Sequence, residues 1–178
     1  MKEVIYKAFT IFDYEEEEKW LNDMASKGKN FTDISLFRYV FEDGKPGEYI
    51  YRLEMLDKFP NHYKSLEYLR FLEETGIEHV ASILKWVYLR KKASDGPFDV
   101  YSDVDSRINH YNRIIKLANL IIFIQLLIAF PNLNNFIKGY SLSSFCIFNF
   151  VFAIILFLGN RSLYKKVDKL EKEKLYKE

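Results

Sequence analysis

Four aspartates in one short stretch are the first residues of this sequence that could do chemistry. The stretch from Arg90 to Arg113, RKKASDGPFDVYSDVDSRINHYNR, holds Asp95, Asp99, Asp103 and Asp105 among arginines and lysines. Acidic residues at alternate positions bind calcium in EF-hand loops, but those loops also need a glycine at the sixth position. Here Arg107 follows the last two aspartates and no glycine stands at that position. We therefore interpret the stretch as a connector in which Ser102 or Asp103 caps a helix.

No other group of residues in the sequence matches a catalytic or metal-binding motif. Cys146 is the only cysteine, so no zinc site can be built from several thiolates. The three histidines (His62, His79 and His110) lack the i, i+4 spacing of a metalloprotease pair, and no phosphate-binding glycine loop occurs. The net charge of +1 gives no general attraction to nucleic acid. We predict a protein that is not an enzyme, holds no cofactor or metal and does not bind nucleic acid directly.

The last third of the chain is apolar enough to lie in a membrane. The segments Ile114–Phe130 and Leu142–Gly159 are apolar on every face. At about 1.5 Å per residue each is roughly 25 Å long, close to the ~30 Å of a hydrocarbon core. We predict a transmembrane helical hairpin over residues 108–160, with a loop from Pro131 to Ser141. The alternative is a buried helix pair in a soluble protein, but the rest of the chain is too short to cover two such helices.

The charges around the hairpin predict its orientation. Basic residues lie before the first helix and after the second, whereas the loop between them has only Lys138. By the positive-inside rule both termini then face the cytoplasm, which predicts a cell-membrane protein with two spanning helices. Asn119, Gln125 and Asn149 lie within the helices. Their amides could join the two helices or bind a partner helix, with each hydrogen bond worth on the order of 1 kcal/mol.

The first 93 residues are predicted to form a cytoplasmic α+β domain. Their hydrophobic periods give the order β-α-β-β-α-β, the ferredoxin-like arrangement of a four-stranded antiparallel sheet with two helices on one face. Asp13 would cap the first helix and form a capping box with Glu16, and Asn61 would cap the second helix. After this domain (1–93) come a juxtamembrane connector (94–107), the hairpin (108–160) and a charged helical tail (161–178).

The predicted sheet has a central hairpin and one open face. The turn GKPG separates the strands FTDISLFRYVFED and GEYIYRLEML. Their alternation turns the aromatic residues inward and leaves a candidate interaction face of Arg38, Arg52, Glu54 and Lys85. If Arg38 lies opposite Arg52, the like charges could form an anion or partner site. A two-residue shift in register would instead pair Arg38 with Glu54 on an ordinary solvated face.

Several segments together resemble a known bacterial family. FTIFDYEEEEKWLNDMASKGKNF, FRYVFEDGKPGEYIYRLEML and FLEETGIEHVASILKWVYLRKKASDGPFDVYSD, followed by DSRINHYNR, are similar to the "domain of unknown function 2812" family over residues 3–113. The resemblance implies C-terminal membrane helices and frequent encoding beside a PadR-type transcriptional repressor. It supplies no catalytic residues.

Three functions remain open from the sequence. The leading hypothesis is a membrane-anchored, non-enzymatic regulatory or interaction protein, whose α+β module binds a protein partner or a small ligand. A PadR-type repressor is one candidate partner, and self-association is also open. The second hypothesis is an accessory subunit of a membrane transporter, held by the amides within the helices. The third is an enzyme acting on lipid headgroups, with Arg38 and Arg52 holding phosphate and Glu54 as the base.

Overall fold

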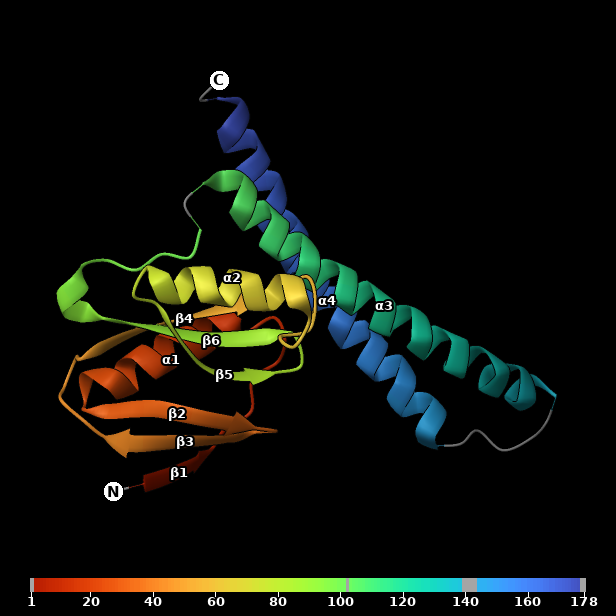
Figure 1. Ribbon diagram of the computed structural model, residues 1–178. Coiled ribbons are helices and arrows are strands. Elements are labelled where there is room, and N and C mark those ends of the chain that lie inside the picture. The colour runs from red at the N-terminus through yellow and green to blue at the C-terminus, as the bar shows by residue number, and fades with distance from the viewer. Residues whose placement is uncertain (1, 102, 139–143, 177–178) are drawn as a thin grey trace. The chain divides into compact units, whose positions relative to one another are not determined.

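The chain forms two compact units in the computed structural model, which describes residues 2–101, 103–138 and 144–176. The first unit ends at Asp103 and the second begins at Val104. The first is an α+β unit and the second is a pair of long helices (Figure 1).

The first unit contains two three-stranded antiparallel sheets and two helices. One sheet has the strand order β1-β3-β2 and the other the order β4-β6-β5. The elements are β1 (Lys2–Tyr6), α1 (Tyr14–Ser26), β2 (Lys29–Ser35), β3 (Arg38–Asp43), β4 (Tyr49–Met55), α2 (Tyr63–Glu74), β5 (Glu78–Ile83), β6 (Trp86–Lys92) and a short 3-10 helix (Ala93–Asp95).

This unit is a β-α-β-β motif that occurs twice. In each copy the third strand lies between the other two, and the second strand carries an irregularity in its register, at Phe31/Asp33 and at His79/Ala81. Each helix is followed, after one capping residue, by a glycine with positive φ, Gly28 after α1 and Gly76 after α2, a common way to end a helix.

The α+β class is therefore confirmed, but the ferredoxin-like arrangement is not. The predicted central hairpin is wrong: β3 pairs with β1 and β2, and β4 pairs with β6. The GKPG segment packs against the end of α1 instead, where Gly44 N–H donates to the Gly28 carbonyl and Gly47 N–H to the Ala25 carbonyl. The two-residue hairpins lie elsewhere, at Leu36–Phe37 and Leu84–Lys85.

The sequence does not indicate these two hairpins, because their turns lack the usual glycine or asparagine. Phe37 has φ 60° and Leu84 has φ 54°, a region that favours glycine or asparagine. A bulky residue there costs roughly 1–2 kcal/mol relative to an ordinary backbone conformation. Each tip is tied back to its own repeat, by Lys7 N–H to the Phe37 carbonyl (2.9 Å) and Leu56 N–H to the Lys85 carbonyl (2.8 Å).

Helix α1 covers the free edge of β4, which is an outer strand of the second sheet. The Asn22 side chain accepts from Tyr51 N–H (2.8 Å) and donates to the Tyr51 carbonyl (3.0 Å), and Glu18 Oε2 accepts from Leu53 N–H (3.0 Å). An unprotected edge strand invites pairing with another chain. Side chains of the first repeat thus satisfy backbone groups of the second.

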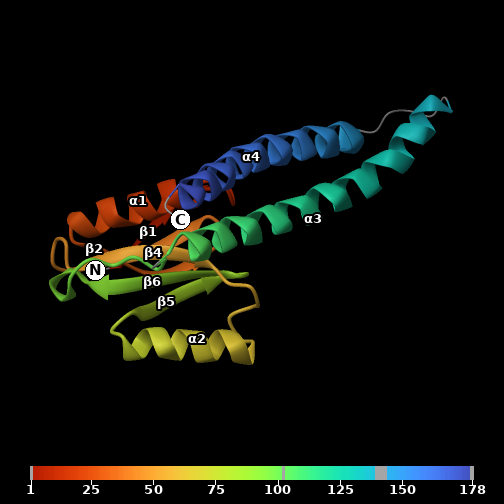
Figure 2. The same ribbon diagram turned by 90° about the horizontal axis from the view of Figure 1, so that it is seen from above.

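Helix α2 covers the opposite face of the second sheet (Figure 2). Neighbouring residues of β6 point to opposite faces. Val87 and Leu89 pack with Leu69 and Leu72 of α2, while Tyr88 points toward α1. Phe98 belongs to the same apolar cluster, so the predicted connector packs partly on the sheet.

The predicted helix caps are only partly correct. Asp13 stands at the N-cap of α1, but its carboxylate accepts from Thr10 N–H (3.0 Å) and the Thr10 hydroxyl (2.7 Å), so the capping box with Glu16 does not form. His62 replaces Asn61 as the cap of α2, because its ring accepts from Lys64 N–H.

The second unit consists of α3 (Val104–Ile137) and α4 (Ser144–Leu175), which pack against each other. Each contains a segment long and apolar enough to cross a membrane, Val104–Leu133 and Ile147–Leu175. Helix α3 continues through Pro131, so the predicted loop begins too early. Residues 139–143 of the predicted loop lie outside the described residues, and so does Ser102, one of the two predicted helix caps. The tail continues α4 to Leu175.

Candidate ligand-binding cleft

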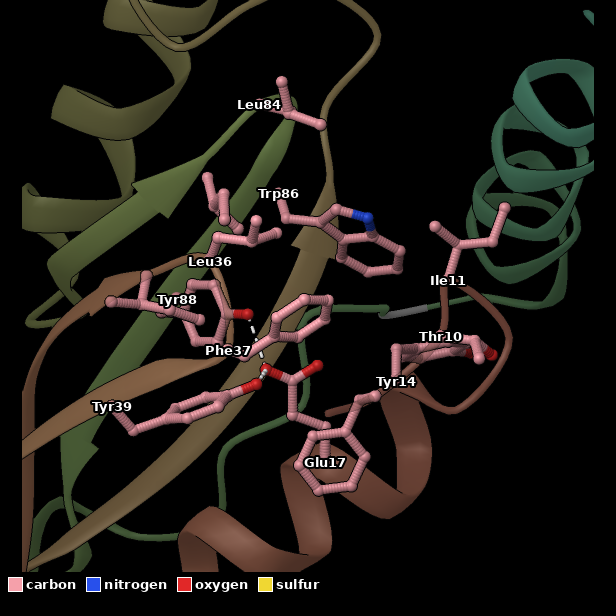
Figure 3. Close-up of a pocket in the computed structure, with 13 residues that line it drawn as sticks. Thr10, Ile11, Tyr14, Glu17, Leu36, Phe37, Tyr39, Leu84, Trp86 and Tyr88 are labelled. Carbon is pink, nitrogen blue, oxygen red and sulfur yellow. Dashed lines mark hydrogen bonds between the residues drawn. The ribbon is translucent and has the colours of Figure 1, made fainter. Parts of the chain in front are cut away.

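A cleft of about 170 Å³ opens in the first unit between the two hairpin tips and the start of α1 (Figure 3). The β1–α1 loop, α1 and both hairpins line it, so both repeats contribute. Its walls are mostly aromatic and aliphatic. The lining residues are Phe9, Thr10, Ile11, Tyr14, Glu17, Ile34, Leu36, Phe37, Tyr39, Ile83, Leu84, Trp86 and Tyr88.

The cleft has a buried floor and an exposed apolar rim. Tyr14 and Trp86 are buried and their ring centroids lie 5.4 Å apart. At the rim, Leu36 is 71% exposed, Leu84 72% and Phe37 50%. Large apolar side chains held in water at strained turns are costly, and such strain is typical of ligand clamps and other functional sites.

Glu17 is the one acidic residue among the described residues that line the cleft. Its side chain is 6% exposed, and its Oε1 accepts hydrogen bonds from the Tyr39 hydroxyl (2.6 Å) and the Tyr88 hydroxyl (2.5 Å), as Figure 3 shows. Tyr39 comes from the first sheet and Tyr88 from the second. The carboxylate therefore joins the two repeats at the floor of the cleft.

Burial changes the acidity of all three groups. Burial raises the pKa of the Glu17 carboxyl, and the two tyrosine hydrogen bonds oppose that rise. Burial and the neighbouring Glu17 charge both raise the pKa of Tyr39 and of Tyr88. The two hydroxyls therefore stay protonated and remain donors to the carboxylate.

Glu18, the next residue of α1, has a basic partner, whereas Glu17 has none among the described residues. Arg52 Nη1 lies 3.4 Å from Glu18 Oε1. In the described part of the chain no lysine, arginine or histidine pairs with Glu17, and none lines the cleft. A buried carboxylate without a cation is an unusual electrostatic arrangement.

The four residues predicted as one interaction face are divided between the two sheets. Arg38 lies in β3, opposite Tyr6 and Ser35, so its predicted pairing with Arg52 or Glu54 is wrong. The other three belong to the second sheet and its turns. Arg52 pairs with Glu18, the buried Glu54 accepts from the Tyr68 hydroxyl (2.8 Å), and Lys85 donates to the Asp57 carbonyl (2.7 Å). Of the three residues assigned to a lipid-headgroup enzyme, Arg38 therefore lies in the first sheet, and Arg52 and Glu54 lie in the second.

The amides predicted within the membrane helices have different surroundings. Asn119 accepts from Asn160 (2.7 Å) and donates to the Tyr164 hydroxyl (3.1 Å), so it joins α3 to α4. Asn149 is buried. The Oε1 of Gln125 is buried and accepts no hydrogen bond from any residue that the structure describes.

Sequence reasoning missed the cleft, although one signal was present. The run Glu15–Glu18 by itself indicates only a helix start, where negative charge is favourable. The buried residues of α1 are Tyr14, Glu17, Leu21 and Ala25, which follow the three- and four-residue spacing of a core-facing stripe. A glutamate within such a stripe indicates a buried carboxylate, which calls for a structural or functional reason.

Comparison with known families assigns most of the chain. A family model described as "Protein of unknown function (DUF2812)" matches residues 13–124, which include α1 and therefore Glu17. Comparisons with curated proteins and with solved structures found no match.

Proposed function

We infer a function from the cleft, on the premise that this chain belongs to the DUF2812 family of proteins of unknown function. We propose a membrane-anchored, non-enzymatic regulatory protein, whose α+β unit binds a small ligand. The observation that carries the proposal is the aromatic cleft with the buried Glu17 at its floor. An apolar pocket with a few converging polar groups and a perturbed carboxyl pKa is the usual form of a ligand site.

The composition of the cleft favours binding over catalysis. Its described lining residues include no histidine, cysteine, lysine or arginine. The hydroxyls nearest Glu17 belong to Tyr39 and Tyr88, whose raised pKa values keep them protonated at neutral pH. General acid–base catalysis works best when the pKa of the catalytic group is near the working pH.

The proposal places α3 and α4 in the cell membrane with both chain ends in the cytoplasm. The length and apolar composition of the two helices support insertion, and the basic residues beside both chain ends support the orientation. A ligand in the cleft would regulate a partner at the inner face of the membrane, and a PadR-type repressor is one candidate. Co-purification of that repressor from membranes in maltoside detergent tests this part.

The binding function is tested by molecules that co-purify with the full chain. Ile34→Trp places a large ring in the cleft, whereas Ser35→Trp adds the same ring on the opposite face of β2. Native mass spectrometry should detect a small molecule on the wild type and on Ser35→Trp, and not on Ile34→Trp. In cells, Ile34→Trp should alter the same transcripts as deletion of the gene. If the three proteins carry the same molecules, or none, the binding function is wrong.

A second candidate, a subunit of a membrane complex such as a transporter, is favoured by Gln125. Its Oε1 is buried without a described partner, and a change of the Gln125 rotamer would bring that oxygen to a donor on a partner helix. Gln125→Leu should then release the protein from a larger species on native gels. Asn119→Leu serves as the control, because its amide is used between α3 and α4. A native-gel pattern that Gln125→Leu leaves unchanged contradicts this candidate.

A further inference from the structure

We propose that the cleft binds an organic monocation, a quaternary ammonium or protonated amine attached to an apolar body, with its charge beside Glu17. This inference rests on the proposed binding function and names the class of ligand. Four features of the cleft carry it.

The first feature is the unbalanced charge of Glu17. Buried ionised groups in proteins are nearly always paired with an opposite charge or bound to a metal. Glu18 obeys this rule through Arg52, and Glu17 has no basic partner in the described residues. The described residues also contain no group of three metal-ligating side chains. In the empty cleft a proton neutralises Glu17, as its raised pKa favours, and an organic cation is the counter-ion that can take the place of that proton.

The second feature is the direction of the tyrosine hydrogen bonds. Both hydroxyls donate to the same oxygen, Oε1, at 2.5 and 2.6 Å. Donation of this kind favours the ionised carboxylate, against the larger effect of burial, and fixes its orientation. No described residue donates to Oε2, so that oxygen can face a ligand.

The third feature is the aromatic wall. Tyr14, Trp86, Tyr39 and Tyr88 surround the carboxylate (Figure 3). The negative face of an aromatic ring attracts a cation, and cages of such rings recognise quaternary ammonium groups. The same wall does not favour an anion, because its described residues include no lysine, arginine or histidine.

The fourth feature is size. An engineered cavity of about 150 Å³ in another protein holds one benzene molecule. A cleft of about 170 Å³ therefore accepts one ammonium head or one ring. The rest of the ligand would leave through the rim, where Leu36, Phe37 and Leu84 offer exposed apolar surface.

A matched pair of probes tests the charge requirement. Phenyltrimethylammonium and tert-butylbenzene have the same shape, and only the first carries a positive charge. The full chain in maltoside micelles is titrated with each probe by ligand-observed NMR, as wild type, Glu17→Gln and Glu16→Gln. Glu17→Gln keeps an acceptor for the tyrosines, and Glu16→Gln removes the same charge from an exposed position on α1. Partition into micelles is common to the three proteins and cancels between them.

We expect the cation to bind wild type and Glu16→Gln alike, and Glu17→Gln about tenfold or more weakly. tert-Butylbenzene should not distinguish the three proteins. Tyr14→Leu, which removes an aromatic wall and no charge, gives a second variant should Glu17→Gln fold poorly. It should weaken the cation and leave the neutral probe unaffected.

Two outcomes overturn the inference. Equal binding of both probes to wild type and Glu17→Gln would show a neutral apolar site, and the binding function would stand. Failure of both probes, while a small molecule still co-purifies in the Ile34→Trp comparison, would also exclude this ligand class without excluding the function. A choline headgroup of a lipid carries the same chemistry as a soluble cation. Displacement of the probe by phosphatidylcholine nanodiscs, and not by phosphatidylglycerol nanodiscs, would identify the lipid as the source.

Discussion

The two β-α-β-β repeats have the same topology and use their helices in opposite ways. Helix α1 lies against both sheets, contributes Glu17 to the cleft and Asn22 to the edge of β4. Helix α2 contributes Leu69 and Leu72 to an aliphatic core on the outer face of the second sheet. The position of Glu17 in α1 is taken by Ser65 in α2. One repeat therefore only stabilises the unit, while the other combines stabilisation with a polar site.

The largest expected effect comes from breaking the aromatic contact between the repeats. Phe31 is fully buried, and its ring contacts those of Tyr39 and Phe41 in its own sheet and of Tyr51 and Tyr88 in the other. Phe31→Ala should lower the free energy of unfolding by about 3–5 kcal/mol. Guanidinium denaturation monitored by circular dichroism measures it. Phe71→Ala on the exposed side of α2 is the control, with a change of about 0.5 kcal/mol or less.

The next largest effect compares the two helices by their hydrogen bonds to the edge of β4. Asn22→Ala removes the partner of Tyr51 N–H and should cost about 1–3 kcal/mol, because a donor of the buried Tyr51 loses its acceptor. The counterpart of Asn22 in α2 is the exposed Arg70. Arg70→Ala should change the unfolding free energy by less than about 0.5 kcal/mol. Equal costs for the two substitutions would mean that α1 has no special role at the edge.

The pH dependence of stability should reveal Glu17. Burial raises its pKa in the folded state, so between the unfolded and folded pKa values the native protein binds more protons than the unfolded chain. Stability at low pH is then lost as the pH rises through the folded pKa of Glu17. The groups facing it are Tyr39, Tyr88 and Asp13, of which the tyrosines stay protonated over this range.

Glu17→Gln should therefore gain stability relative to the wild type as the pH rises from about 4.5 to 8. Urea unfolding at a series of pH values gives the difference between the two proteins. Glu18 also has a raised pKa, but it is present in both proteins and cancels. A difference that is constant with pH, or that shrinks as the pH rises, contradicts the burial of an ionisable Glu17.

The smallest effect concerns the turns of the two hairpins at the rim of the cleft. Leu84 has φ 54° and an exposed side chain, so Leu84→Asn should stabilise the protein by up to about 1 kcal/mol. Leu36, the corresponding residue of the first repeat, does not have a positive φ, and Leu36→Asn should give no gain. Differential scanning calorimetry of the two variants compares them. The same Leu84→Asn change should weaken ligand binding, because it removes apolar surface from the rim.

The sequence predicted the parts of this protein that depend on local patterns. Helix ends at Gly28 and Gly76 and two long apolar helices follow from capping and composition. The pairing of strands did not follow, because the GKPG turn has stronger local signals than the true hairpins at Phe37 and Leu84. The cleft depends on that pairing: Tyr39 and Tyr88 meet at Glu17 only when the two sheets are correctly assembled.

The contact between α1 and the edge of β4 also has a consequence for synthesis. Because a chain leaves the ribosome N-terminus first, α1 emerges before β4 does. Asn22 and Glu18 are then already present when the edge donors of Tyr51 and Leu53 appear. From this order along the chain we expect the edge of the nascent second sheet to be protected from aggregation, and a circular permutation that moved β4 ahead of α1 to lose that protection.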